Sequence, residues 1–158
     1  MSQDTSRLYS ENNLSEFEKL FGLNFKDKAL LVTALSHRNP LGLSLTSKDE
    51  MLRLALLGDK IIDLILYRAL YARDTPLKEM NDARRMTENT ELDKIADGLG
   101  FEKYLFLEES VDEKIRVKSV SFGSDSLEAL VGAIFIDGSF FDTQRFVEKW
   151  ILQNMPLN

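Results

Sequence analysis

The sequence contains no cysteine and only one histidine, which excludes several kinds of site. Without cysteine there is no disulfide and no thiolate metal site, and the composition is compatible with a reducing compartment. A lone histidine cannot provide the imidazole pairs common in zinc sites. We interpret it, His37, as a structural residue at a helix end. Any metal site in this chain is therefore expected to use oxygen ligands.

Long uncharged apolar stretches are also absent. Five charged residues interrupt the most apolar run, Met51–Leu70, and the polar N-terminus has no apolar signal region. We therefore expect a cytoplasmic protein that does not associate with membranes. The net charge of −6 argues against a protein that coats nucleic acid by charge alone, because neutralising phosphates requires clustered lysines and arginines.

The length of 158 residues and the apolar content of 44% fit one domain with a substantial core. We expect residues 1–12 to form a disordered tail and residues 13–155 to form the domain. Signals for β-strands are nearly absent, whereas apolar residues recur at helical spacing along most of the chain. The predicted fold class is all-α.

Capping residues and helix-breaking residues indicate where the helices begin and end. Asn13 with Glu16, and Ser47 with Glu50, fit the capping box that opens a helix, so Glu50 is interpreted as a cap rather than a catalytic acid. Segment 101–107 fits either a helical turn or extended chain, and 108–122 is predicted to be a variable connection. The first predicted helix begins at Asn13 and is stopped by Gly22, and the next two run over Asp27–His37 and Lys48–Ala72. A fourth starts with Thr75 as its cap and Pro76 as its first residue, and a fifth is capped by Asn89 or Thr90 and ends at Gly98 or Gly100. The last two run over Ser124–Gly138 and Phe140–Asn154.

The helix around Asp59 is the element on which the functional prediction depends. Apolar residues lie on nearly every face of Met51–Leu70, which predicts a position at the centre of the domain or against a second chain. An aspartate in such surroundings must be ion-paired, hydrogen-bonded or bound to a metal. Gly58 precedes it, although glycine is unfavourable inside a helix, and this indicates close approach of another helix or of a ligand.

A second apolar run, Ser124–Gly138, carries Asp125 and Glu128 three residues apart, so both carboxylates lie on one helix face. The pair could also be a solvated or capping face, as in many helices. If it faces Asp59, the three carboxylates could hold one Mg²⁺ ion, or Mn²⁺ in its place. Such a site would serve phosphoryl chemistry.

The order of these motifs resembles the catalytic domain of ribonuclease III, over roughly residues 14 to 152. The resemblance implies an all-α homodimeric endonuclease that cleaves double-stranded or structured RNA with Mg²⁺. It implies that Asp59, Asp125 and Glu128 are metal ligands and that Asp59 and Glu128 are the most important catalytic residues. The matching segments are Phe21–Asp27, Leu35–Asn39, Arg53–Asp59 with its Gly-Asp pair, Asn89 with Leu92, and Asp125–Gly138.

The sequence departs from the family's pattern in three places. Ala55 stands four residues before Asp59, where the family usually has a glutamate, and Leu52 replaces another acid. Leu56 stands where an aromatic residue commonly inserts into the partner chain. We expect the chain either to lack the double-stranded-RNA-binding domain that is usual in the bacterial enzymes or to be a fragment of a longer protein. RNA affinity would then depend on lysines and arginines of the domain or on an RNA-binding partner protein; the candidates are Lys78, Arg84, Arg85, Lys114, Arg116 and Lys118.

Two functions follow as hypotheses. The first is a divalent-metal-dependent endoribonuclease, supported by three acids at matching positions in helices where neutral residues would pack more easily. The second is a non-catalytic ribonuclease-III-like domain that serves as an RNA-binding or structural component of a ribonucleoprotein or processing complex. Ala55 and Leu52 favour the second hypothesis, whereas the retained acids and the acidic composition oppose it.

Overall fold

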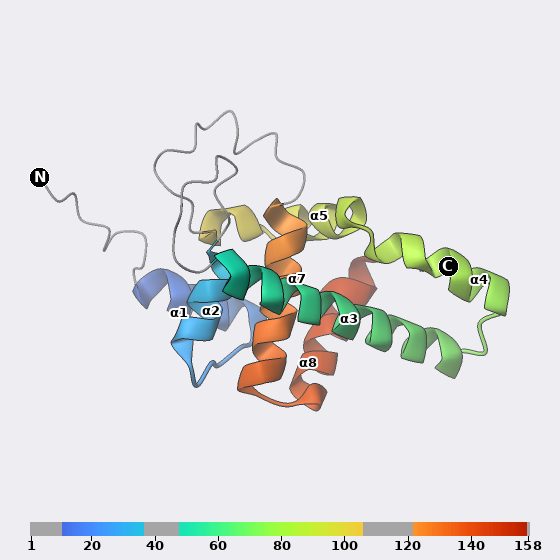
Figure 1. Ribbon diagram of the computed structural model, residues 1–158, viewed down its shortest axis with the longest axis horizontal. Coiled ribbons are helices and arrows are strands. Elements are labelled where there is room, and N and C mark those ends of the chain that lie inside the picture. The colour runs from blue at the N-terminus through green and yellow to red at the C-terminus, as the bar shows by residue number, and fades with distance from the viewer. Residues whose placement is uncertain (1–10, 37–47, 106–121, 158) are drawn as a thin grey trace, which may run out of the picture.

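The computed structural model describes residues 11–36, 48–105 and 122–157, and every element in these ranges is helical (Figure 1). The all-α prediction is confirmed for this part of the chain. The elements are α1 (Glu11–Phe21), α2 (Lys28–Leu35), α3 (Lys48–Ala72), α4 (Leu77–Asp82), the 3₁₀ turn η2 (Ala83–Thr87), α5 (Asn89–Gly98), the 3₁₀ turn η3 (Phe101–Tyr104), α7 (Phe122–Asp137), α8 (Phe140–Phe146), the π-helical turn η4 (Val147–Ile151) and the 3₁₀ turn η5 (Leu152–Asn154).

Helices α3 and α7 cross at the centre of the molecule, and α2, α5 and α8 pack against α7 (Figure 1). The crossing is close because each helix has a glycine at it. A Cβ atom on Gly58 would lie 1.8 Å from the backbone oxygen of Glu128, and one on Gly132 would lie 2.2 Å from that of Leu54. The predicted close approach at Gly58 is confirmed, and the neighbour is a helix.

Aromatic rings join the first helix to the end of the chain. Phe17 and Phe21 of α1 contact Phe101 of η3 at ring-centroid distances of 5.5 and 5.3 Å. Phe21 also meets Trp150 of η4 at 5.1 Å in an edge-to-face arrangement, which is a favourable geometry for aromatic pairs. This cluster connects α1 with η3 and η4.

Two helix ends agree with the sequence prediction. Helix α3 has the predicted bounds. Helix α1 ends at Phe21. The next residue, Gly22, has a positive φ of 67°, and the N–H of Leu23 donates to the oxygen of Glu18 at 2.8 Å. This is the left-handed glycine cap expected there.

The start of α2 also agrees with the prediction, because Asp27 is its N-cap and accepts the N–H of Ala29 at 2.9 Å. The helix ends at Leu35, two residues before the predicted end at His37. His37 and Ser47 lie outside the described residues, as do residues 1–10 of the predicted tail.

Several predicted helix starts are displaced. Helix α1 begins at Glu11, so Asn13 lies inside it rather than at its cap. Pro76, not Thr75, is the N-cap of α4, because its oxygen accepts the N–H of Met80 at 3.0 Å. Glu88, not Asn89 or Thr90, is the N-cap of α5.

The last two helical segments also differ from the prediction. Helix α7 begins at Phe122, two residues before Ser124. The predicted single helix over residues 140–154 is helical throughout but changes winding twice, from α to π and then to 3₁₀. Segment 101–107, whose sequence fits either a helical turn or extended chain, begins with a 3₁₀ turn.

Candidate active site

Glu128 is the most unusual acid among the described residues. It lies on α7 at the contact with α3 and is only 7% exposed. Its carboxyl group has no hydrogen bond or ion pair with any described residue. Burial raises its pKa from 4.5 to about 8, and the negative charges of Asp59, Asp125 and Asp63 add to this effect. In the absence of a cation this carboxyl group favours the neutral form.

Asp59 lies on α3, partly buried, with an ion-pair partner. Its Oδ2 atom lies 2.6 Å from Nζ of Lys60, and the side chains of Asp59 and Lys60 are 27% and 68% exposed. The expectation that this acid is paired is confirmed. The partner is an exposed lysine, which a competing cation could replace at small cost, because exposed ion pairs contribute little stability.

Asp125 lies in the first turn of α7, three residues before Glu128, and is partly buried. The predicted grouping of the three acids is supported electrostatically, because Asp59 and Asp125 each raise the pKa of Glu128. The sequence prediction missed a fourth member, Asp63. It follows Asp59 by four residues on α3, a spacing that places both on one helix face.

The acids surround Glu128 without forming a ready metal cage. Among the described residues, no group of three histidine, aspartate or glutamate side chains stands close enough together to hold a metal ion. Lys60 holds Asp59, and like-charged carboxylates repel one another when nothing lies between them. An oxygen-only donor set around a buried, unpartnered Glu128 nevertheless fits a hard divalent cation. The metal-ligand assignment stays a prediction.

The N-terminal end of α7 is held by an acid from another helix. Asp93 of α5 is buried, and its Oδ1 atom accepts the N–H of Ser124 at 2.7 Å. Burial raises the pKa of Asp93, and the hydrogen bonds from Ser124 act in the opposite direction. This contact fixes the turn that carries Asp125. The capping acid lies about thirty residues away in the sequence. The residues near Ser124 therefore do not indicate that α7 begins before it.

The departures from the family pattern lie on α3. Ala55 is buried at 4% exposure, so no carboxylate occupies that position, whereas Leu56 is 63% exposed. Of the basic candidates, Lys78, Arg84 and Arg85 are exposed, and Lys114, Arg116 and Lys118 lie outside the described residues. Within the described ranges, no helix has the length and apolar character needed to cross a membrane.

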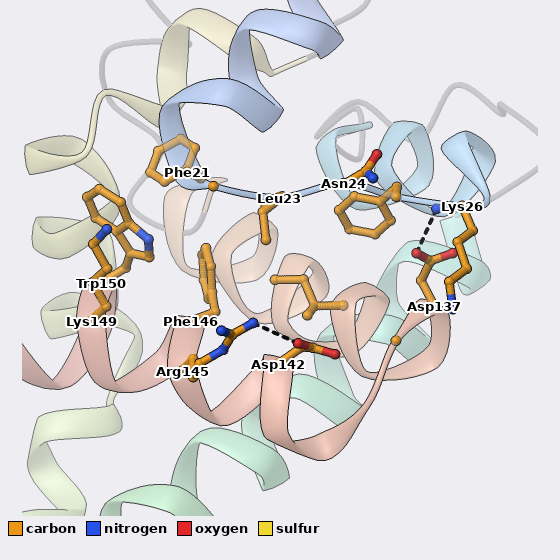
Figure 2. A pocket seen from close by; sticks show the side chains of 14 residues that line it. Phe21, Leu23, Asn24, Lys26, Asp137, Asp142, Arg145, Phe146, Lys149 and Trp150 are labelled. Carbon is orange, nitrogen blue, oxygen red and sulfur yellow. Dashed lines mark hydrogen bonds and ion pairs between the residues drawn. The ribbon is translucent and has the colours of Figure 1, made fainter.

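A cavity of about 450 Å³ lies at the other end of α7, between the α1–α2 connection and α8 (Figure 2). Its acids all have partners. Asp137 accepts the backbone N–H groups of Lys26 and Asp27, each at 2.8 Å. Asp142 pairs with Arg145 at 2.8 Å. The unpartnered Glu128 therefore distinguishes the candidate active site from this cavity.

Comparison with known families identifies the fold that carries this site. A family model described as Ribonuclease-III-like matches residues 27–155. The chain belongs to the ribonuclease-III-like family. Ribonuclease 3 of Francisella tularensis subsp. novicida is 32% identical over 139 residues, which is 86% of this chain and 57% of that protein. Ribonuclease 3 of F. tularensis subsp. tularensis strain SCHU S4 is 30% identical over the same share of each chain.

Solved structures agree with this assignment. Two structures of the nuclease domain of ribonuclease III from Campylobacter jejuni match with TM-scores of 0.76 and 0.77, both at 26% sequence identity. They cover 89% and 94% of this chain, and the matches take in 96% and 98% of those chains. The present chain spans little more than half the length of the Francisella relatives. The predicted fold, that of a ribonuclease III nuclease domain, is confirmed.

Proposed function

We propose that this chain is a divalent-metal-dependent endoribonuclease that cleaves double-stranded or structured RNA. The observation that carries the proposal is the state of Glu128, which is buried and unpartnered and lies within electrostatic reach of Asp59 and Asp125. A protein that used α7 only for packing would be more stable with a neutral residue at this position. Membership of the ribonuclease-III-like family supplies the reaction class.

In this proposal Asp59, Asp125 and Glu128 hold Mg²⁺, or Mn²⁺ in its place, and Asp59 and Glu128 are the catalytic residues. When bound, the metal supplies an activated water and stabilises negative charge on the phosphate. Asp93 has a positioning role, because it fixes the turn of α7 that presents Asp125. Loss of the usual acid at Ala55 removes one ligand, and Mg²⁺ commonly fills such positions with water.

We further propose that two copies of the chain form the working unit. Leu56 and Leu64 on α3 are 63% and 55% exposed. Large exposed apolar residues on the central helix are expected at a protein interface. One of the similar Campylobacter jejuni structures is described as having a region involved in dimer formation. A homodimer would cover these leucines beside the candidate active site.

RNA binding in this proposal depends on basic residues close to the acids. Arg84 is exposed on η2, and its charge acts on Lys60, the ion-pair partner of Asp59. Basic side chains at this distance could contact phosphates on either side of the cleavage point. Because the chain as a whole is acidic, a partner protein with its own RNA-binding surface would add affinity.

The test is incubation of the purified chain with a long end-labelled RNA duplex in Mg²⁺, in Mn²⁺ and in chelator. The Glu128→Gln variant is run in parallel, because the amide keeps the shape of the side chain but removes its charge. We expect metal-dependent shortening of the duplex by the parent chain and loss of this cleavage in the variant, because the amide no longer offers a charged ligand to the metal. Light scattering on the same samples should give twice the chain mass of 18.1 kDa.

Equal cleavage by the parent and the variant would contradict the site assignment. A second candidate function, a non-catalytic RNA-binding component, is favoured by one observation, the buried alanine at position 55. It predicts a gel-shifted complex with the duplex and no cleavage in either metal. The same experiment therefore separates the two functions.

A further inference from the structure

Asp63 lies one helical turn beyond Asp59 on α3, on the side opposite Ala55. Ala55 precedes Asp59 by one helical turn, and Asp63 follows it by one turn, so the three positions share a face of α3. Ala55 is buried and has no polar group to offer. Asp63 is partly buried, and its Oδ1 atom is shielded from solvent and has no hydrogen-bond partner among the described residues.

The direction of the helix crossing places Asp63 on the same side as the other acids. Gly58 meets the backbone of Glu128, and Gly132 meets that of Leu54. As the residue numbers rise along α3, the numbers of the residues that face it on α7 therefore fall. Asp63 and Asp125 consequently lie on one side of the contact at Gly58, and Ala55 lies toward Gly132 on the other side.

Two observations of the structure support a bound cation at this group of acids, the burial of Glu128 and the solvent-shielded, unpartnered Oδ1 atom of Asp63. Glu128 is more than nine-tenths buried and has no partner among the described residues. Asp63 acts on Glu128 electrostatically, as Asp59 and Asp125 do. A buried carboxylate without a partner costs considerable free energy, and three further acids around it increase that cost. A bound divalent ion would offset the cost for all four.

We propose that Asp63 is a fourth carboxylate of the cation site, taking in this chain the part of the acid that is missing at position 55. The inference rests on the proposed function, since it adds a ligand to the site of Asp59, Asp125 and Glu128. Binding of the ion would displace Lys60 from Asp59, because the two cations compete for the same oxygen atoms. The site thereby keeps four carboxylates, with one moved by two turns along α3.

The experiment is a calorimetric titration of the full chain with Mn²⁺, without RNA, so that the measured quantity is affinity rather than activity. The variants are Asp63→Asn, which keeps the side-chain shape, and Asp142→Asn, an exposed acid on α8 that removes the same charge away from the site. Thermal unfolding checks that each variant is folded. If Asp63→Asn does not fold, Asp63→Ser replaces it.

We expect the Mn²⁺ dissociation constant to rise at least about tenfold in Asp63→Asn, which is the lower end of the loss seen for residues that support metal ligands. It should be unchanged in Asp142→Asn. Equal affinity in the parent and Asp63→Asn would overturn the role of Asp63 and leave the proposed function standing. A parent chain that binds no Mn²⁺ would overturn both.

Discussion

The acids at the two ends of α7 lie in opposite environments. Near its start, Asp125 and Glu128 lie beside Asp59 and Asp63, and Glu128 has no partner among the described residues. At its end, Asp137 accepts two backbone N–H groups and so holds the α1–α2 connection against the helix (Figure 2). A carboxylate that is fully hydrogen-bonded stabilises the fold, whereas a buried one without a partner destabilises it. The first end fits a binding role, and the second a structural role.

The largest effect should come from the crossing that holds the first end in place. In Gly58→Ala the new Cβ would lie 1.8 Å from a backbone oxygen of Glu128, so the helices must separate. We expect a loss of unfolding free energy of at least about 3 kcal/mol, the upper part of the usual range for overpacking. Urea denaturation measures it.

Gly98→Ala is the matched control for Gly58→Ala, because nothing lies within 4 Å of the position where its Cβ would be. It ends α5 and should leave stability unchanged or slightly increased. A Gly58→Ala variant as stable as Gly98→Ala would contradict the close helix contact.

The next largest effect is the pH dependence of stability that Glu128 causes when a chelator removes divalent cations. Its folded-state pKa of about 8 exceeds the ordinary 4.5, so the folded state binds the proton more tightly than the unfolded state. The stability that this gives is fully present below about pH 4.5 and is lost as the pH rises through 8. Glu128→Gln should therefore become more stable than the parent as the pH rises from 5 to 8.

Urea denaturation at several pH values between 5 and 8 measures this difference, with Asp142→Asn as the charge-matched control. Parallel pH profiles for the parent and Glu128→Gln would mean that Glu128 has a partner in solution. The claimed difference between the two ends of α7 would then disappear.

A smaller effect is expected at the structural end. In Asp137→Asn only one oxygen remains to accept the two N–H groups of Lys26 and Asp27. We expect a loss of about 1.5 to 3 kcal/mol, the range for hydrogen bonds to a charged group. Asp142→Asn, which breaks an exposed pair with Arg145, should change the denaturation midpoint least. Equal effects of the two substitutions would contradict the structural role of Asp137.

Local sequence patterns were sufficient to predict much of this architecture. Helix α3, the Gly22 stop and the Asp27 cap depend on a few neighbouring residues, and their spacing is visible in the sequence. Gly58 was predicted to mark a close approach, because a glycine in such an apolar helix needs a reason. These features depend on propensity and capping, which act within one or two helical turns.

Features that depend on distant contacts were not predictable in this way. Asp93 caps α7 from another helix, so α7 begins at Phe122, two residues before the start that its local sequence predicts. The role of Gly132 emerges only when α3 crosses it. Asp63 carried a usable signal, its four-residue spacing from Asp59, but only the crossing direction shows that it lies on the side of Asp125. The grouping of Asp59, Asp125 and Glu128 is a hypothesis that the residues themselves suggest and that the family resemblance strengthens.

The most direct test of the central claim is the unfolding free energy of the parent chain and of Glu128→Gln at pH 8, each with and without millimolar Mg²⁺. We expect Mg²⁺ to stabilise the parent, because a cation that binds the folded state but not the unfolded state shifts the equilibrium toward the folded state. The stabilisation should be much smaller in Glu128→Gln. An equal response of both proteins, or no response of the parent, would contradict the claim that Glu128 is the centre of a cation site.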